Sequence, residues 1–517
     1  MKIGFLYVGS SLFPYGFRKL GSIARQFDPT CHLHFLIPKD QHYNSLSSFL
    51  GLKDSSPAFT PDEFREIAGT FSEMDIIAIS SMSLEASLVK QLTPALRKAN
   101  PRAIILWGGV HAIIAPEDCI PFVDGICTNE GELVFHEILQ HIEEGRSYLD
   151  VHNFWFNLDG NIIRNPMRPL MNSKEMTALP FPHYGENERI YQKGRGFRMV
   201  TVRDHLKLSA MCYNTIWTRG CPFKCTYCSN NKFLSVDREY GKIRHPSIDH
   251  IIGEIKAALS KHPHLQSIAF HDDCLISLSP EILHEFAKRF KEEIRLPFAV
   301  YGLTPVHIKQ EKVEILLSGG LNRVRMGIQS GSDEILKFYK RPNRKGMVKE
   351  SINILGGFKK RIMPPAYDII LDNPVETQSD VCDTLLLVNS MPRPFTLNIF
   401  SLRSIPNTEL EQQLKEIKGI NVSIGDVNYL TVAPTFANIL LYIVSIVHLP
   451  ATVIKFFLRF CKPAHESRKL GRWVLIPFQL AFLFKRVIYH IFFRDFSVTF
   501  GRTGYFLWKR GFLKTRR

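Results

Sequence analysis

The chain alternates short apolar runs with helix-like segments in two separate blocks, and this alternation constrains its fold more than any other feature. In residues 1–145 the expected strands lie at 2–8, 32–37, 75–81, 103–107 and 125–128. The last three are short apolar runs, as is typical of strands buried on both faces of a parallel sheet. Apolar residues at helical spacing over 85–98 and 132–143 complete the pattern. We therefore predict an α/β, doubly wound, Rossmann-like domain of about five strands.

A second block, from about residue 212, predicts six more strand–helix units. The expected strands are 215–218, 267–271, 298–301, 323–328, 366–371 and 396–401. The expected helices are 248–261, 280–293, 305–318, 346–359 and 378–389. Six such units fit a partial (β/α)6 TIM-type barrel, whose functional groups gather at the carboxyl ends of the strands. Between the blocks, residues 146–204 predict a linker that contains a hairpin turning at Asp159-Gly160.

Charge is distributed unevenly along the 517 residues. The formal net charge is +16, yet residues 451–517 hold 15 lysines and arginines against two acidic residues, a net charge of +13. The rest of the chain is nearly neutral, which disfavours a uniformly basic surface for nucleic acid.

The C-terminal segment is also strongly apolar. Two runs, 433–457 and 473–484, are each broken by polar or helix-breaking residues, namely Asn438, His448, Pro450 and Pro477. Neither run therefore predicts an uninterrupted spanning helix. We expect residues 433–517 to contact an anionic membrane surface as an interfacial or re-entrant anchor. The alternative is a helical domain with one buried apolar face and one solvated basic face.

The first residues lack the charged start, long apolar stretch and cleavage site of a signal peptide. Ten cysteines in 517 residues are too few for a disulfide scaffold. We therefore expect a cytoplasmic protein, peripheral on the inner face of the membrane, in which clustered cysteines bind metal.

Three cysteines, Cys221, Cys225 and Cys228, follow the first barrel strand at C-x3-C-x2-C spacing. Thiolates are suitable ligands for iron–sulfur clusters and for zinc. Structural zinc normally takes four protein ligands, and the nearest other cysteines are Cys212 and Cys274. Three thiolates on a [4Fe–4S] cluster leave one iron open to a small molecule. A zinc site and three incidental thiols remain the alternatives.

With Tyr227 directly before the third cysteine, the loop resembles the CxxxCx(aromatic)C signature of the radical S-adenosylmethionine (radical SAM) superfamily. The resemblance covers about 212–410 and implies that SAM binds the open iron and is cleaved to a 5′-deoxyadenosyl radical. It also implies SAM contacts from Tyr227, Asp272, Asp273, Gln329 and Ser330. Many relatives carry Glu where this chain has Gln329, and a solvated turn is the alternative for the aspartate pair. No general acid or base can be assigned.

In the first block, one strand ends in Gly108-Gly109, with His111 two residues later and Glu130 in a following Asn-Glu-Gly-Glu segment. This pattern resembles the cobalamin (B12)-binding domain that precedes many radical SAM barrels. The resemblance implies cobalamin contacts from Ser80, Ser81, Ser83, Gly108, Gly109, His111 and Glu130. The chain lacks the D-x-H-x-x-G motif whose histidine binds cobalt from below. A degenerate domain without cofactor is the alternative, and His111 could be an ordinary hydrogen-bonded loop histidine.

These patterns predict a cobalamin-binding-like domain at 1–145, a linker at 146–204, a radical SAM barrel at 205–410 and a helical membrane-associating region at 411–517. The implied activity is cobalamin-dependent methylation of an unactivated carbon on a lipid-like or other hydrophobic substrate. It would need an electron donor such as flavodoxin or ferredoxin. The alternatives are cyclisation, rearrangement or oxidation by the same radical, and a non-catalytic membrane-associated protein that binds B12 or metal.

Overall fold

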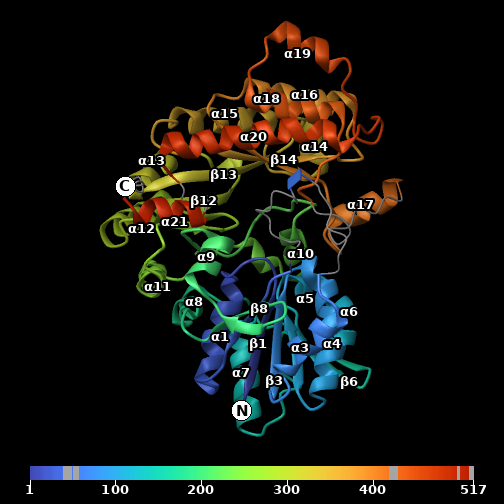
Figure 1. The fold of residues 1–517 in the computed structure, drawn as a ribbon, viewed down its shortest axis with the longest axis vertical. Coiled ribbons are helices and arrows are strands. Elements are labelled where there is room, and N and C mark those ends of the chain that lie inside the picture. The colour runs from blue at the N-terminus through green and yellow to red at the C-terminus, as the bar shows by residue number, and fades with distance from the viewer. Residues whose placement is uncertain (39–48, 51–57, 419–428, 496, 498–500, 512–517) are drawn as a thin grey trace.

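The computed structural model describes the chain except for residues 39–48, 51–57, 419–428, 496, 498–500 and 512–517. These gaps include part of the predicted membrane-contact segment. Figure 1 shows two bodies along the long axis of the molecule, the N-terminal sheet at one end and a second sheet with the C-terminal helices at the other.

The N-terminal sheet has nine strands among the described residues, in the order β7-β6-β5-β4-β3-β1-β2-β8-β9. The strands are β1 Ile3–Val8, β2 Leu33–Leu36, β3 Ile76–Ser81, β4 Ile104–Gly108, β5 Gly125–Cys127, β6 Phe154–Leu158, β7 Asn161–Arg164, β8 Glu188–Gln192 and β9 Gly196–Met199. The five expected strands form its parallel centre.

Two antiparallel hairpins, β6–β7 and β8–β9, extend this sheet at its two edges. The expectation of about five strands was therefore too low, and segment 146–204 is more than a linker because it supplies four strands. Short edge strands that are half exposed leave only a weak apolar alternation. The predicted turn is present, with Asp159 and Gly160 both at positive φ, as a two-residue hairpin of type I′ requires.

Helices cover both faces of this sheet, which confirms the doubly wound class. On β1, Phe5 and Tyr7 face α1 (Tyr15–Phe27) and α7 (Glu132–Glu143), while Leu6 and Val8 face the opposite core. That opposite core contains α3 (Pro61–Gly69) and α4 (Ala86–Ala99). Shorter helices are α5 Val110–Ile114, α6 Pro116–Cys119, α8 Ser173–Ala178 and α9 Val202–Ser209.

The second sheet is parallel throughout and follows chain order, which confirms a partial barrel of six strands. The strands are β10 Cys212–Thr215, β11 Ser267–Phe270, β12 Phe298–Leu303, β13 Leu321–Gln329, β14 Ala366–Leu371 and β15 Thr396–Ser401. The helices are α10 Ser229–Val236, α11 Ile248–Lys261, α12 Pro280–Glu293, α13 Gln310–Gly319, α14 Asp333–Phe338, α15 Lys345–Gly357, α16 Gln378–Ser390 and α17 Glu409–Lys418.

The first barrel strand ends at Thr215 and not at 218 as expected. The backbone N–H groups of Trp217 and Thr218 donate to the side chain of Asp272 instead of pairing with the next strand. The strand therefore stops before the cysteine loop, and an aspartate holds the start of that loop.

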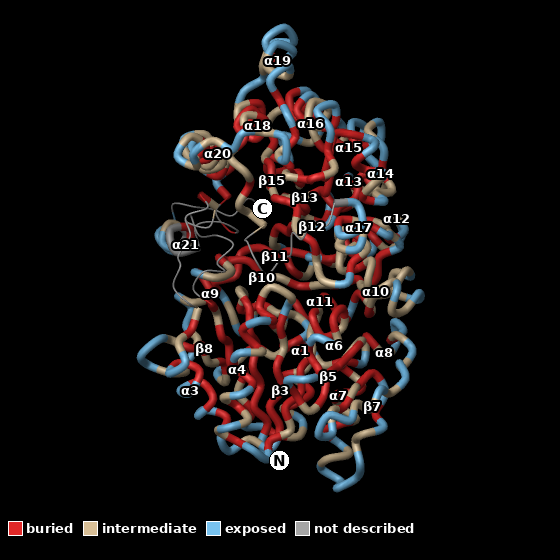
Figure 2. The backbone as a smooth tube through the Cα atoms, turned by 90° about the vertical axis from the view of Figure 1, so that its right-hand side faces the viewer, coloured by how far each residue is buried: buried red, intermediate tan, exposed pale blue. Residues whose placement is uncertain are grey.

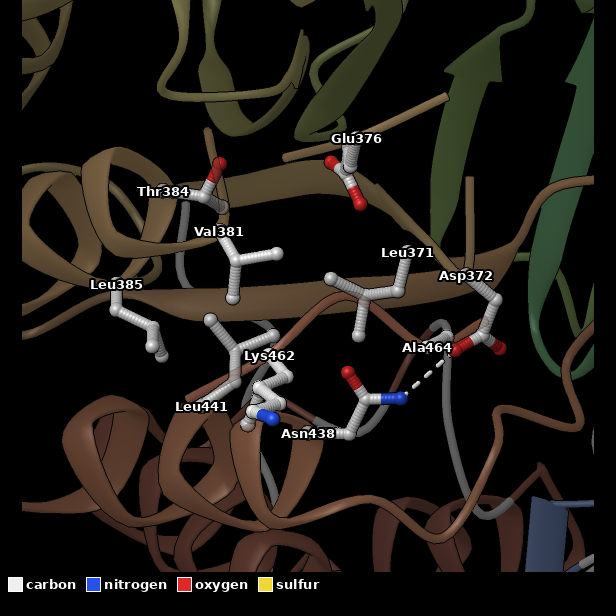
Figure 3. A pocket seen from close by; sticks show the side chains of 11 residues that line it. Leu371, Asp372, Glu376, Val381, Thr384, Leu385, Asn438, Leu441, Lys462 and Ala464 are labelled. Atoms are coloured by element: carbon white, nitrogen blue, oxygen red, sulfur yellow. Dashed lines mark hydrogen bonds between the residues drawn. The ribbon is translucent and has the colours of Figure 1, made fainter. Parts of the chain in front are cut away.

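Four C-terminal helices complete the fold: α18 Phe436–Ile446, α19 Ala451–Leu458, α20 Arg472–Phe493 and α21 Gly501–Lys509. Helix α18 lies in the barrel core, so the alternative of a buried apolar face holds for this part of the tail. Figure 3 shows Asn438 of α18 pointing to Asp372 at the end of β14, and its Nδ2 donates to Oδ1 at 2.8 Å. Figure 2 shows α19 as an exposed projection at the barrel end of the molecule.

Candidate functional site

The three cysteines of the predicted cluster loop lie between β10 and α10, at the carboxyl end of the barrel sheet. Cys221 and Cys225 are buried and Cys228 is partly exposed. Gly220 has φ +106°, and a Cβ there would lie 2.3 Å from the carbonyl oxygen of Lys242, so only glycine fits. The loop is thereby pinned to the segment that follows α10.

The thiols of the loop are suitable ligands for an iron–sulfur cluster or for zinc. Within the described ranges, no group of three His, Cys, Asp or Glu side chains is close enough together to bind one ion. The buried Cys274 adds a fourth thiol beside the loop, with its Sγ 3.8 Å from that of Cys221.

A guanidinium that the sequence patterns did not single out lies beside this loop. Arg341 Nη1 is 3.5 Å from Cys225 Sγ, and Arg341 Nη2 donates to the carbonyl oxygen of Gly327 at 2.7 Å. The arginine follows α14 in an ordinary Lys-Arg pair, so no motif marks it. Tyr227 packs edge-on against Tyr339 with 5.1 Å between ring centroids, and its predicted SAM contact stays a prediction.

The structure gives the two aspartates after β11 different surroundings. Asp272 is buried, and its carboxyl group accepts hydrogen bonds from the backbone N–H groups of Trp217 and Thr218, while its SAM contact stays a prediction. Burial raises the pKa of Asp272 to about 7. Asp273 accepts a hydrogen bond from the hydroxyl of Tyr240 at 3.1 Å and remains a candidate.

The segment at the end of β13 combines strain with close packing. Gln329 is the last residue of the strand, has φ +74° and is buried, so its backbone is in a region that non-glycine residues rarely adopt. Its side chain lies over Gly327, where a Cβ would be 2.6 Å from Gln329 Nε2. Ser330 is fully buried and hydrogen-bonded to Thr384 at 3.2 Å, and its SAM contact stays a prediction.

The inner face of the barrel sheet carries polar side chains that the sequence patterns also missed. Val324, Met326 and Ile328 point into the core, so Arg325 lies on the other face of β13. Arg325 Nε donates to Asp368 on β14 at 2.8 Å, and Asn398 on β15 donates to the same carboxylate at 2.8 Å. At the end of β11, His271 is hydrogen-bonded to Asn214 at 2.9 Å.

A narrow cavity of about 40 Å³ opens at the carboxyl end of β4 in the first domain. Gly108 leaves room there, because a Cβ would contact nothing closer than Cys127 Cβ at 3.8 Å. Gly109 has φ +96°, and a Cβ would lie 2.5 Å from the carbonyl oxygen of Ser81. Aromatic and aliphatic side chains line the cavity, namely Phe5, Phe17, Leu20, Leu106, Trp107, Phe135 and Phe154.

The apolar lining of this glycine-edged cavity suits an apolar part of cobalamin, but the cavity must widen to admit it. Binding benzene alone takes a cavity of roughly 150 Å³, so the side chains lining this one must move apart on binding. Ser80 also lines the cavity, so it remains, with Gly108 and Gly109, a candidate cobalamin contact.

The other predicted cobalamin contacts are already engaged within the protein. Ser81 accepts a hydrogen bond from the Trp107 indole at 3.0 Å. His111 is buried between Ser83 at 3.1 Å and Asp118 at 2.9 Å, and burial lowers its pKa. His111 thus has the hydrogen bonds of an ordinary loop histidine, and the cobalamin contacts of Ser81, Ser83 and His111 stay predictions.

Glu130 forms part of a charged network that joins the two domains. Arg244 Nη2 donates to Glu130 Oε1 at 2.9 Å, and Arg219 lies 3.5 Å from the same oxygen. Arg219 also pairs with Glu132 at the start of α7, and this ion pair is largely buried. Burial disfavours the charge on Glu132, but Arg219 holds its pKa below the usual carboxyl range. Glu130 thus binds the barrel, and its cobalamin contact stays a prediction.

Two family models match the chain, one over most of the domain with the glycine-edged cavity and one over the barrel with the cysteine loop. The B12 binding domain matches residues 49–139, and the radical SAM superfamily model matches residues 215–388. A radical SAM domain uses a [4Fe–4S] cluster and SAM, and the first match adds cobalamin.

Curated relatives are similar at low identity. An uncharacterized methyltransferase of Pyrococcus horikoshii is 26% identical over 335 residues, covering 62% of this chain and 66% of the relative. An anaerobic magnesium-protoporphyrin IX monomethyl ester cyclase of Rubrivivax gelatinosus is 23% identical, covering 39% and 34%. A bacteriochlorophyllide d C-12(1)-methyltransferase of Chlorobaculum tepidum is 23% identical, covering 59% and 62%. The chain therefore spans 66% or less of these relatives' lengths.

Two solved structures share the fold. The radical SAM methyltransferase TsrM from Kitasatospora setae superposes with a TM-score of 0.60 at 13% identity, covering 81% of this chain and 77% of that one. The cobalamin-dependent SAM radical enzyme OxsB superposes with a TM-score of 0.61 at 11% identity, covering 100% and 82%. Together with the cysteine loop, the two family matches show that the chain contains a radical SAM superfamily domain at residues 215–388, preceded by a B12 binding domain at residues 49–139.

Proposed function

We propose that this enzyme transfers a methyl group to an unactivated carbon of a hydrophobic small molecule. The observation that carries the proposal is the charged network between the domains. Arg219 stands two residues before Cys221 and pairs with Glu130 and Glu132, which lie at the start of α7 beside the glycine-edged cavity. One buried contact therefore ties the cluster loop to the cobalamin cavity.

When bound, the cluster with SAM supplies a carbon-centred radical that removes a hydrogen atom, and cobalamin supplies a transferable methyl group. The chain's own residues would hold and orient these groups. Cys221, Cys225 and Cys228 would bind the cluster, and Arg341 beside Cys225 would offset thiolate charge.

The inner face of the barrel would receive the polar part of the substrate. Arg325, Asp368 and Asn398 form a hydrogen-bonded group there, and Arg325 is about one third exposed. Such a group orients a substrate without needing to exchange a proton. Gln329, held in a strained backbone over Gly327, would contact SAM through a neutral amide.

The names of the relatives support methyl transfer and also supply the main alternative. Two of the three relatives described above are named methyltransferases, and the third is named a cyclase. The same radical could therefore drive a cyclisation in this chain without methyl transfer. The fold does not separate the two, because both chemistries begin with hydrogen abstraction.

The substrate is proposed to be lipid-like and the enzyme to work at the cytoplasmic face of a membrane. The basic, apolar tail supports this part of the proposal, with a net charge of +13 over residues 451–517. A one-electron reductant such as flavodoxin or ferredoxin would complete the system.

The test uses full-length protein reconstituted anaerobically with iron, sulfide and cobalamin. The protein is incubated with SAM deuterated in its methyl group, a reductant, and lipid extracts that supply candidate hydrophobic substrates. The proposal predicts formation of 5′-deoxyadenosine and S-adenosylhomocysteine with deuterium in an extract component, all lost in Cys225→Ala. Formation of 5′-deoxyadenosine and a product without deuterium would overturn methyl transfer and favour cyclisation.

A further inference from the structure

Helix α20 exposes a continuous apolar stripe to solvent. Most of its exposed large side chains are three, four or seven residues apart, which places them on one helix face, and none of them is charged. They are Trp473, Leu480, Phe484, Ile488, Ile491 and Phe492. Trp473 is 76% exposed, Phe484 67% and Phe492 79%. At 1.5 Å per residue the stripe is about 28 Å long. A contiguous exposed apolar patch that is flanked by polar residues is typical of a protein or membrane contact.

The opposite face of α20 is tethered to the protein along its whole length. Arg472 donates to the carbonyl oxygen of Val432 at 3.1 Å, and Gln479 donates to that of Phe49 at 3.0 Å. Lys485 donates to the carbonyl oxygen of Ser445 in α18. Just beyond the helix, Asp495 pairs with Arg323 of β13 at 2.9 Å.

These tethers decide how the helix can meet a membrane. Among the described helices, α20 is the one long and apolar enough to cross a bilayer by length and composition. Crossing would strip partners from buried polar side chains and leave them in hydrocarbon, which is strongly unfavourable. The exposed stripe can enter a membrane without breaking any of these contacts, provided that the helix lies parallel to the surface.

Exposed cations accompany the stripe at the same end of the molecule. Helix α19 carries exposed Lys455 and Phe456, and the two residues directly after Leu458, Arg459 and Phe460, are also exposed. Both views place α19 and α20 at the end away from the N-terminal domain (Figures 1 and 2). Other exposed cations around α20 are Lys462, Arg468, Lys469 and Arg494, against one exposed acid, Glu466.

We propose that α20 docks lengthwise on an anionic lipid bilayer, with its apolar stripe in the outer acyl region and the surrounding cations at the headgroups. The docking surface is defined as Trp473, Leu480, Phe484, Ile488, Ile491 and Phe492. Charge complementarity selects an anionic bilayer as the occupant, because a neutral partner would leave the cations uncompensated. This inference deepens the membrane contact of the proposed function and adds the side and orientation of that contact.

The experiment measures flotation of the full-length holoenzyme with vesicles, without SAM or substrate. The vesicles are phosphatidylcholine with and without phosphatidylglycerol. The wild type is expected to float only with phosphatidylglycerol and to be released by high salt. Phe484→Glu/Phe492→Glu should bind at least tenfold more weakly, because two aromatic side chains no longer enter the bilayer.

A matched pair of exposed apolar residues on the N-terminal domain provides the control. Phe122 and Leu158 are 41% and 42% exposed, so Phe122→Glu/Leu158→Glu adds the same charge elsewhere and should bind vesicles as the wild type does. Replacing Lys455 and Arg459 by Gln should weaken binding by about fivefold per residue if both meet the headgroups.

Three results would overturn the inference. Equal flotation of the wild type and of Phe484→Glu/Phe492→Glu would show that the apolar stripe does not contact the bilayer. Resistance of membrane-bound wild type to alkaline carbonate extraction would show a spanning helix. A concentration-dependent dimer that disappears in the variant, without flotation of the wild type, would assign the stripe to a second copy of the chain. None of these readouts involves catalysis, so methyl transfer could fail or succeed independently.

Discussion

Replacing Gly108 by valine tests whether the cavity at the end of β4 binds cobalamin. A Cβ at this position meets no atom closer than 3.8 Å, and the backbone of Gly108 is not in the left-handed region. The side chain should therefore be accepted and should fill part of the 40 Å³ cavity. At about 24 cal/mol per Å³, filling it adds at most ~1 kcal/mol to the stability of the cobalamin-free domain.

The same side chain should block the cofactor. If cobalamin affinity falls tenfold, the stabilisation by cobalamin at one hundred times the wild-type Kd falls from ~2.7 to ~1.4 kcal/mol. Thermal unfolding of wild type and Gly108→Val, with and without cobalamin, measures both effects, and absorbance titration gives the affinity directly. Gly69→Val is the control, because nothing lies within 4 Å of a Cβ at Gly69 on the exposed end of α3.

Unchanged cobalamin affinity in a folded Gly108→Val variant would refute the assignment of this cavity. If that variant fails to fold, Gly131→Ala offers an independent route, since its Cβ would lie 3.4 Å from Cys127 Sγ in the same cavity. Both variants should retain the iron–sulfur cluster, because neither touches the barrel.

Further predictions concern the barrel and its contact with the first domain. Arg219→Gln should destabilise the docked domains by about 3 kcal/mol at pH 7, as expected when one partner of a buried pair is lost. Because Arg219 lowers the pKa of Glu132, the loss of stability should be full above pH ~5 and should shrink as the pH falls through the pKa of Glu132 in the folded protein. Denaturant unfolding at several pH values measures this dependence. A loss of stability that is the same at every pH would contradict the prediction. Arg341→Gln should shift the cluster to a lower reduction potential than Arg341→Lys does, measured by electron paramagnetic resonance titration, and equal potentials would argue against a charge effect. Gly302→Ala should destabilise the barrel by more than 2 kcal/mol in the same unfolding assay, because φ is +74° and its Cβ would lie 2.2 Å from the carbonyl oxygen of Asp272.

The sequence predicted the parallel centres of both sheets well, because buried parallel strands are continuous apolar runs. It also predicted the β6–β7 hairpin from the turn at Asp159-Gly160, but it missed the β8–β9 hairpin, whose half-exposed residues carry little periodicity. It also extended the first barrel strand past Thr215, since the carboxyl group of Asp272 that ends the pairing lies more than fifty residues away in the chain. Local patterns cannot contain such a contact.

In the candidate site too, local features could be predicted from the sequence and long-range contacts could not. The cysteine spacing and the glycine pair are local, and both mark loops at the carboxyl ends of strands. Glu130 matched a local pattern, but its ion pair with Arg244, which joins the two domains, could not be predicted because Arg244 is 114 residues away in the chain. Arg341 reaches Cys225 from 116 residues away and belongs to no pattern. Asn438 looked like an interruption of an apolar run, whereas it docks α18 on the barrel.

The family matches imply that one chain holds an iron–sulfur cluster and cobalamin on its two domains. The most direct test is to quantify iron, sulfide and cobalamin in anaerobically reconstituted wild type and in Cys225→Ala. The account predicts about four irons and one cobalamin per wild-type chain, with the iron lost and the cobalamin kept in the variant. Wild-type protein that binds cobalamin but no iron, or a single zinc ion in place of the cluster, would contradict it.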